Sequence, residues 1–171
     1  MTTIIIPSWY VLHTKSRFEN VVHEGLTRKS IEVFLPKVLV RSRRVDRKAM
    51  IRIPLFPGYL FVKSDLTPGR HIEIVKTAGV VRLVGNQSGP VPVSTETVES
   101  LKIMTAGDGK ILTGPILNKG EPVIVISGPF EGVTGTFARY GKTGRVIVNI
   151  EALGQFASVE VDEEDIEVLK Q

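Results

Sequence analysis

Cysteine is absent from this chain of 171 residues, and histidine occurs at only three positions, His13, His23 and His71. The lack of thiols excludes disulfide frameworks, cysteine zinc sites, iron–sulfur clusters and thiol nucleophiles. Three histidines with no carboxylate cluster at ligand spacing do not support a metal site. We therefore expect no metal and no cofactor, and a chain without disulfides suits the reducing cytoplasm.

Long hydrophobic runs are also lacking. The run from Ile4 to Ile6 stops at Pro7, so it is shorter than the core of a signal peptide. The longest later aliphatic run, Val123 to Ile126, is far below the roughly 20 residues of a membrane-spanning helix. With 42% hydrophobic and 23% charged residues, the composition is typical of a soluble globular protein, so we expect no membrane partner.

A motif for catalysis is missing as well. Gly141, Lys142 and Thr143 resemble the end of a nucleotide-binding P-loop, but that motif needs a glycine five residues before Gly141, where Thr136 stands. The segment also lies between two predicted strands, which favours a hairpin turn. No Ser/His/Asp order or carboxylate pair appears in a supporting context, so we predict that the chain is not an enzyme.

Charge is unevenly distributed along the chain. Residues 1–110 hold 17 basic and 9 acidic residues, a net charge of +8, whereas residues 111–171 hold 5 and 9, a net charge of −4. This contrast suggests two units with different partners, of which the basic one can approach nucleic acid. The alternative is that charge merely varies between domains.

A glycine-rich stretch separates the two parts. Ala106 to Gly120 holds four glycines and Pro115, a composition typical of a linker. We therefore expect two domains, 1–105 and 120–171, joined by a flexible linker over 106–119.

Helices and strands alternate in the first domain. The capping-box pattern of Ser16 and Glu19 predicts an amphipathic helix from about Arg17 to Lys29. The further expected elements are helices from Pro68 to about Lys76 and after Ser94, and strands at 9–13, 33–40, 49–53 and 80–84. Residues 55–62 are expected to form a turn and another strand. Residues 41–48 are expected to form the basic tip of a hairpin. The fold class is α+β, an antiparallel sheet flanked by helices.

The second domain is expected to be all β. Short β-branched segments separated by glycine-containing turns predict a small SH3-like barrel. The segments are Val123 to Ile126, Val133 to Arg139, Arg145 to Ile150 and Phe156 to Val161. Alternation places Val146, Val148 and Ile150 inside the barrel. The acidic run from Asp162 to Asp165 fits a solvated edge.

Several blocks of sequence together resemble one family, the NusG-like bacterial transcription elongation and antitermination factors. The blocks are Trp9 to Lys15, Phe56 to Lys63, Thr77 to Gly85, Pro92 to Ser94 and the KOW-like segment Gly120 to Gly135. The resemblance implies a NusG N-terminal-like (NGN) domain followed by a KOW-containing barrel, in a monomer. The form of residues 54–61 favours a specialised, operon-targeted RfaH-type paralogue, whereas Gly58 has the form of the general factor.

The resemblance implies a role for an aromatic segment. After Pro57, Tyr59 and Phe61 share one face of a strand and Leu60 and Val62 the other. In the family such a patch holds the clamp helices of RNA polymerase's largest subunit, and the start of the following helix contacts a polymerase gate loop. The candidate polymerase-binding residues are Trp9, Phe56, Pro57, Tyr59, Phe61, Arg70 and His71. The alternative is that the aromatic side chains are simply buried.

Basic residues bracket the first helix and crowd the hairpin tip. The resemblance matches Lys15, Arg28 and Lys29 to positions at which RfaH-type relatives touch the non-template DNA strand, and a tip this basic suits upstream DNA. The candidate nucleic-acid-binding residues are Lys15, Arg17, Arg28, Lys29, Arg41, Arg43 and Arg44. The alternative is a set of charges that only keeps these surfaces solvated.

In the barrel, Phe130 is expected at an exposed loop tip between Gly128 and Gly132. The resemblance implies that this loop binds a small-subunit ribosomal protein or the termination factor Rho, with Phe130 and Glu131 as the candidate binding residues. Alternatively, Phe130 caps the core.

An alternative function for the chain is that of a stand-alone RNA-binding or ribosome-associated KOW protein. RNA binding by the barrel requires basic and aromatic residues there, which its net charge of −4 does not favour. We also predict a stable barrel that does not refold as helices.

Overall fold

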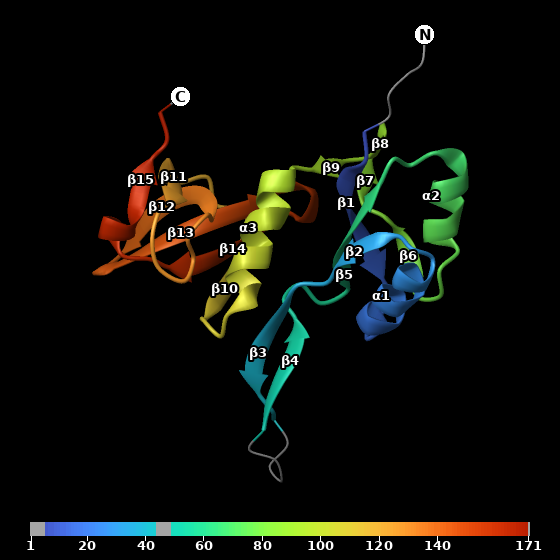
Figure 1. Cartoon of the computed structure of the whole chain (residues 1–171), viewed down its shortest axis with the longest axis horizontal. Helices are drawn as coiled ribbons and strands as arrows, with labels where there is room; N and C mark the ends of the chain where they lie inside the picture. Colours follow the sequence, from blue (N-terminus) through green and yellow to red (C-terminus); the bar gives the residue numbers. More distant parts are fainter. Residues whose placement is uncertain (1–5, 44–48, 171) are drawn as a thin grey trace. The chain divides into compact units, whose positions relative to one another are not determined.

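The computed structural model describes residues 6–43 and 49–170 (Figure 1). By its internal contacts the chain forms two compact units, the first comprising Met1–Pro36 and Pro54–Thr95 and the second Lys37–Ile53 and Glu96–Gln171. The predicted nucleic-acid-binding residue Arg44 lies outside the described residues. None of the helices in the described part of the chain has the length and hydropathy of a membrane span.

The first unit is built on an antiparallel sheet with the strand order β2-β5-β1-β6, in which β9 also pairs with β1. The strands are β1 (Ser8–Thr14), β2 (Glu32–Phe34), β5 (Tyr59–Ser64), β6 (Val80–Leu83) and β9 (Pro92–Val93), and a small hairpin of β7 (Gly85–Asn86) and β8 (Gly89–Pro90) follows β6. Val11 lies opposite Phe61 and Leu12 opposite Leu60, so alternation puts these two pairs on opposite faces of the sheet.

Helices α1 (Glu19–Arg28) and α2 (Pro68–Val75) pack on one face of this sheet. Val22, Leu26 and Ile74 of the helices are fully buried in one hydrophobic cluster with residues of the strands, namely Leu12, Leu60, Val62 and Leu83. Each such fully buried aliphatic side chain contributes about 1.5–3 kcal/mol relative to an exposed one. The predicted α+β class of this part of the chain is confirmed.

The start of α1 differs from the prediction. The helix begins at Glu19, two residues after the predicted start, and no side chain caps it. Arg17 has a positive φ of 67°, and the N–H of Lys15 donates to the carbonyl of Gly79 at 2.8 Å. The Phe18 ring lies on Gly79, where a Cβ would come within 2.9 Å of the ring. The capping-box prediction is wrong because this tertiary contact, rather than Ser16, sets the turn.

The second unit contains a six-stranded antiparallel sheet in the order β10-β14-β13-β12-β11-β15. The elements are β10 (Ile111–Pro115), β11 (Glu121–Val125), β12 (Thr134–Tyr140), β13 (Thr143–Ile150), β14 (Gln155–Glu160), β15 (Ile166–Val168) and the 3-10 turns η1 (Glu151–Leu153) and η2 (Glu163–Asp165). Val146, Val148 and Ile150 are buried together, as their alternation predicts. The predicted all-β class of the C-terminal part is confirmed.

Strand β10 lies within residues 106–119, which we expected to be a flexible linker. Ile111 pairs with Val159 and Gly114 with Phe156 of β14. Glycine and proline are poor strand formers, so the segment gave no strand signal. Gly114 nevertheless suits its place, because the Phe156 ring covers it and a Cβ would come within 2.7 Å of that ring. Residues 111–115 are therefore a strand, whereas the domain boundaries themselves stay a prediction.

Two further elements group with the second unit. β3 (Lys37–Arg41) and β4 (Met50–Pro54) form the predicted hairpin, in which the Ser42 N–H donates to the Ala49 carbonyl at 2.9 Å. Helix α3 (Thr95–Ala106) follows Ser94, and the hydroxyl of its buried Ser100 accepts the N–H of Thr134 at 3.0 Å. We expected this helix in the domain 1–105, but its contacts group it with the second unit.

Candidate interaction surfaces

Three of the expected polymerase-binding aromatic residues are buried. Trp9, Phe56 and Phe61 are 2%, 1% and 0% exposed, and the Phe61 ring stacks on Phe34 at 5.9 Å between centroids. Tyr59 and Phe61 share one face of β5, as alternation predicts, but only Tyr59 is partly accessible. For these three side chains the structure matches the alternative stated from the sequence, burial in the core.

An accessible aromatic pair remains at the end of β5. Register places His13 opposite Tyr59, and their rings stack with 5.0 Å between centroids and 21° between planes. Pro57 beside them is exposed, and Gly58 turns the chain with a φ of +85° while its carbonyl accepts the N–H of Thr14 at 2.8 Å. We call His13, Pro57 and Tyr59 the aromatic step. His13 was not among the predicted site residues, because cross-strand register cannot be read from one strand.

The two candidates on α2 are exposed. Arg70 forms an ion pair with Glu73 at 3.1 Å, which holds its guanidinium along the helix. His71 borders a hollow of about 290 Å³ that Val75 and Val81 also line. Ile72, Val75 and Val81 are 50%, 38% and 48% exposed. This side of α2 therefore presents apolar surface beside an imidazole, as a protein contact needs.

The basic candidates around α1 do not behave alike. Lys15, Arg17 and Arg28 are exposed, and Arg28 forms a long ion pair with Glu24 at 3.9 Å. Lys29 is exposed too, but it donates from Nζ to the Glu73 carbonyl at 2.8 Å and to the Thr77 hydroxyl at 2.9 Å. Its ammonium is thus occupied at the C-terminal end of α2, which leaves it poorly placed for phosphate.

The hairpin carries the other described basic candidates. Arg41, at the end of β3, and Arg43 are both exposed. The other strand of the hairpin, β4, exposes Met50, Ile51 and Ile53 at 55%, 43% and 37%. Both arginines are therefore accessible to an anionic partner, although they belong to the second unit rather than to the unit that holds α1.

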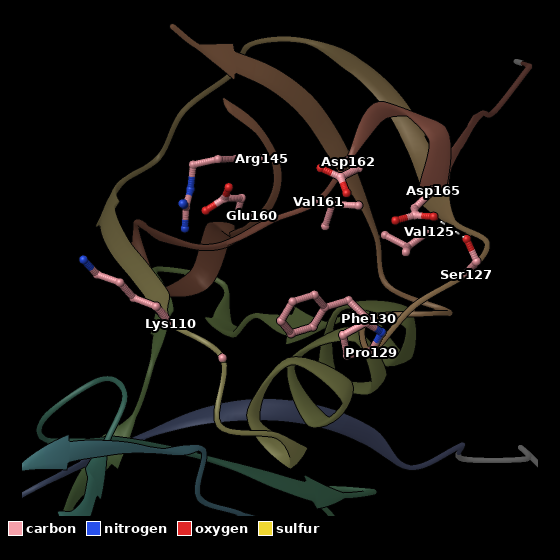
Figure 2. Close-up of a pocket in the computed structure, with 11 residues that line it drawn as sticks. Lys110, Val125, Ser127, Pro129, Phe130, Arg145, Glu160, Val161, Asp162 and Asp165 are labelled. Atoms are coloured by element: carbon pink, nitrogen blue, oxygen red, sulfur yellow. Dashed lines mark hydrogen bonds between the residues drawn. The ribbon is translucent and has the colours of Figure 1, made fainter. Parts of the chain in front are cut away.

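Phe130 and Glu131 lie in the turn between β11 and β12. Gly128 and Gly132 have positive φ values of +88° and +96°, and the Gly132 N–H donates to the Val125 carbonyl at 2.9 Å. Glu131 is exposed, whereas Phe130 is half-buried. Phe130 lines a cavity of about 370 Å³ instead of standing exposed at a loop tip. In Figure 2 its ring points toward the other residues that line this cavity.

Charged side chains surround this cavity. Arg145 donates from Nε to the Ser158 hydroxyl and from Nη2 to the Ser158 carbonyl, both at 3.0 Å. Burial lowers the pKa of Arg145, and the neighbouring Glu160 opposes that change. Asp165 accepts a hydrogen bond from the Ser127 hydroxyl at 2.5 Å. Residues 162–164 are exposed, as predicted for a solvated edge, but no local sequence pattern indicates that Arg145, Asp162 and Asp165 line one cavity.

Comparison with known proteins gives one consistent family. A family model described as "Transcription termination factor nusG" matches residues 7–102. The transcription termination/antitermination protein NusG of Thermus thermophilus is 32% identical over 173 aligned residues, which cover 90% of this chain and 94% of that protein. The protein of the same name from Bacillus subtilis is 29% identical, covering 95% and 98% of the two chains.

A solved structure, "Domain interaction in Thermotoga maritima NusG", has a TM-score of 0.52 and 22% identity with this chain and covers 96% of it and 98% of the other chain. At this identity the likeness shows the fold. The family model spans more than half of the chain, and the Thermus protein matches nearly all of it. The chain thus belongs to the NusG family of transcription termination and antitermination proteins.

Proposed function

We propose that the first unit of this transcription factor binds RNA polymerase and thereby suppresses pausing or termination. The observation that carries the proposal is the aromatic step, in which His13 and Tyr59 stack 5.0 Å apart beside exposed Pro57. Half-buried aromatic side chains supply rigid apolar contact area and are frequent anchors of protein interfaces. The step also lies within the sequence blocks that carry the family resemblance.

The proposed mechanism is a bridge across the polymerase cleft. The aromatic step binds the clamp helices, and the exposed side of α2, with His71 and Ile72, binds the gate loop. Two linked contacts hold more tightly than either alone, because the second forms at a high effective concentration. A clamp held in this way resists the opening of the cleft that we associate with pausing.

For the second unit we propose recruitment of a ribosomal protein or Rho. The turn between β11 and β12 supports this role with exposed Glu131 and half-buried Phe130. The net charge of −4 over residues 111–171 favours a protein partner over RNA. We further propose that the chain acts in the cytoplasm as a monomer, and the RfaH-type assignment stays a prediction.

Replacing both His13 and Tyr59 by alanine is expected to weaken binding of purified bacterial core RNA polymerase about 30-fold, the effect of losing roughly 2 kcal/mol at an interface anchor. The measurement is an equilibrium titration of the full-length chain, with thermal unfolding recorded for each variant. Tyr140→Ala is the matched control, because Tyr140 is a 47% exposed aromatic residue of the second unit.

Two results contradict the proposal. One is polymerase affinity of the His13/Tyr59 variant equal to that of the wild type. The other is a wild-type chain that binds RNA or ribosomes and leaves polymerase unbound, which supports the stand-alone RNA-binding function instead.

The same chain is proposed to contact the non-template DNA strand through the exposed basic residues at α1. A variant with Lys15, Arg17 and Arg28 all changed to glutamine is tested for binding to an elongation complex. The slope of the logarithm of its association constant against the logarithm of the salt concentration is expected to be less steep by about 2, since each phosphate contact on single-stranded DNA contributes about 0.7. Lys29→Gln is expected to leave the slope unchanged, because its ammonium is bonded to Glu73 and Thr77. If Lys29→Gln lowers the slope by as much as each of the other three substitutions does singly, Lys29 contacts DNA as they do and this assignment is rejected.

A further inference from the structure

The cavity beside the turn that joins β11 and β12 combines an apolar wall with a carboxylate-rich wall. It measures about 370 Å³, and all its lining residues belong to the second unit. In Figure 2 the ring of Phe130 forms one side, and Glu160, Val161 and Asp162, at the end of β14, face it from the other. Val161 and Val125, which also line the cavity, are buried and apolar.

The charges on the carboxylate-rich wall are not balanced by ion pairs. Across the described residues, none of the ion pairs within 4.0 Å includes Glu160, Asp162 or Asp165. Two cations also line the cavity, Arg145 and Lys110. Arg145 faces Glu160, but its Nε and Nη2 are held on Ser158, and Lys110 is in none of these ion pairs. Asp165 already accepts from Ser127. Asp162 is exposed. The carboxylates of Asp162 and Glu160 therefore retain capacity to accept hydrogen bonds from a ligand.

A metal ion is a poor candidate for this place. Across the described residues, no group of three or more His, Asp or Glu side chains is arranged to hold one. The Phe130 ring and the two valines offer no ligand atom to a small ion, yet they suit the hydrocarbon part of an organic cation.

We propose that this cavity binds an arginine side chain of a partner protein. A planar guanidinium stacks on the face of an aromatic ring while its N–H groups fork onto a carboxylate, here Phe130 and Asp162. The three methylene groups of the arginine lie against Val125 and Val161. A lysine ammonium is a compact charge without a planar face or a fork of N–H groups, so it cannot both stack on Phe130 and bind Asp162 in two places.

The inference rests on the proposed function, because it specifies the chemistry of the partner that the second unit recruits. The acidic excess of residues 111–171 supports it, since a negative surface attracts a basic segment and orients its approach. The expected partner element is an exposed loop or strand with one arginine that inserts beside the turn, while Glu131 contacts the rim.

The test uses nuclear magnetic resonance of the ¹⁵N-labelled full-length chain, titrated with N-acetyl-arginine methylamide. Matched probes are the lysine compound and the citrulline compound, which has nearly the shape of arginine without its charge. Arginine is expected to shift amide resonances of Phe130 and of residues 160–162 and to bind about tenfold more tightly than citrulline, the loss expected for hydrogen bonds between charged groups. Equal affinity for citrulline, tighter binding of lysine, or shifts confined to other residues overturns the proposal.

Two variants locate the site. Asp162→Asn is expected to weaken arginine binding about threefold, the effect of a single accessible ion pair. Glu164→Gln removes the same charge from an exposed neighbour outside the cavity and is expected to change nothing. Phe130→Leu, which removes the ring and retains an apolar side chain, is expected to weaken binding as well. If Asp162→Asn and Glu164→Gln behave alike, arginine is attracted by general charge and the proposal fails.

This result can be separated from a failure of the proposed function. The Asp162→Asn variant is expected to retain the polymerase affinity of the wild type, because polymerase binding is assigned to the first unit. Loss of polymerase binding in the His13/Tyr59 variant and loss of arginine binding in the Asp162 variant are therefore independent results.

Discussion

Phe61→Ala is expected to lower the free energy of unfolding of the first unit by about 3–5 kcal/mol, the range for removing a large aromatic side chain from a packed core. Phe61 is fully buried and stacks on Phe34 at 5.9 Å, so its removal leaves a cavity that the sheet cannot fill. Chemical denaturation followed by fluorescence measures the effect. Trp9 is the only tryptophan of the chain and is itself buried in β1, so it reports on this unit.

A comparison of variants separates stability from binding at this position. Phe61→Leu retains most of the buried volume and is expected to cost about 1 kcal/mol, a common value for a point substitution. If Phe61→Ala unfolds at the same denaturant concentration as the wild type and yet no longer binds polymerase, then Phe61 contacts polymerase directly. That result would contradict a purely structural role for this side chain. Loss of polymerase by an unfolded variant, in contrast, says nothing about the interface.

Gly120→Ala is expected to destabilise the second unit by about 3 kcal/mol through backbone strain and a backbone clash. Gly120 has a φ of +93°, and a Cβ there would lie 2.0 Å from the carbonyl oxygen of Phe137, which is backbone and cannot rotate away. Circular dichroism in the far ultraviolet should show an earlier transition, while the fluorescence transition of Trp9 stays in place. Polymerase affinity measured below this transition should also be unchanged.

Gly141→Ala is the control for this prediction. Gly141 also has a positive φ, +64°, but a Cβ there meets no atom within 4 Å. It is expected to cost only about 1 kcal/mol, the penalty for a side chain in the left-handed region. Equal losses of unfolding free energy in Gly120→Ala and Gly141→Ala would show that the close approach of Gly120 to β12 is not the cause of the destabilisation. A shift of the Trp9 transition in Gly120→Ala would show that the two units unfold together.

Much of the fold could be predicted because its signals are local. β-branched residues between glycine turns predicted the strands β11 to β14, and Thr67 followed by Pro68 predicted the start of α2. These signals work because alternation and φ preferences act over a few residues. The start of α1 and the strand β10 escaped prediction for the opposite reason. The contact of Phe18 with Gly79 sets the start of α1, and the contact of Gly114 with Phe156 accompanies the pairing of β10. Both partners, Gly79 and Phe156, come from distant parts of the chain.

The candidate sites show the same limit more strongly. Alternation correctly grouped Tyr59 with Phe61, yet the two differ in accessibility, because exposure depends on what other segments cover a face. Lys29 has the same charge as Lys15, but only the packing of α1 beside α2 brings its ammonium to Glu73 and Thr77. Nothing in a single strand indicated that His13 would stack on Tyr59.

By itself, the sequence determined the family, the two fold classes, the opposite charge of the two parts and the positions of most turns. The fold classes, the charge and the turns depend on composition and on short-range periodicity, which one chain carries in full. The family followed from the resemblance of several blocks of sequence. The tertiary structure alone decided which aromatic residues are buried, which basic residues are occupied, and that Phe130 and Asp162 line one cavity. Those properties depend on cross-strand register and on packing between distant segments, for which a linear sequence has no local signal.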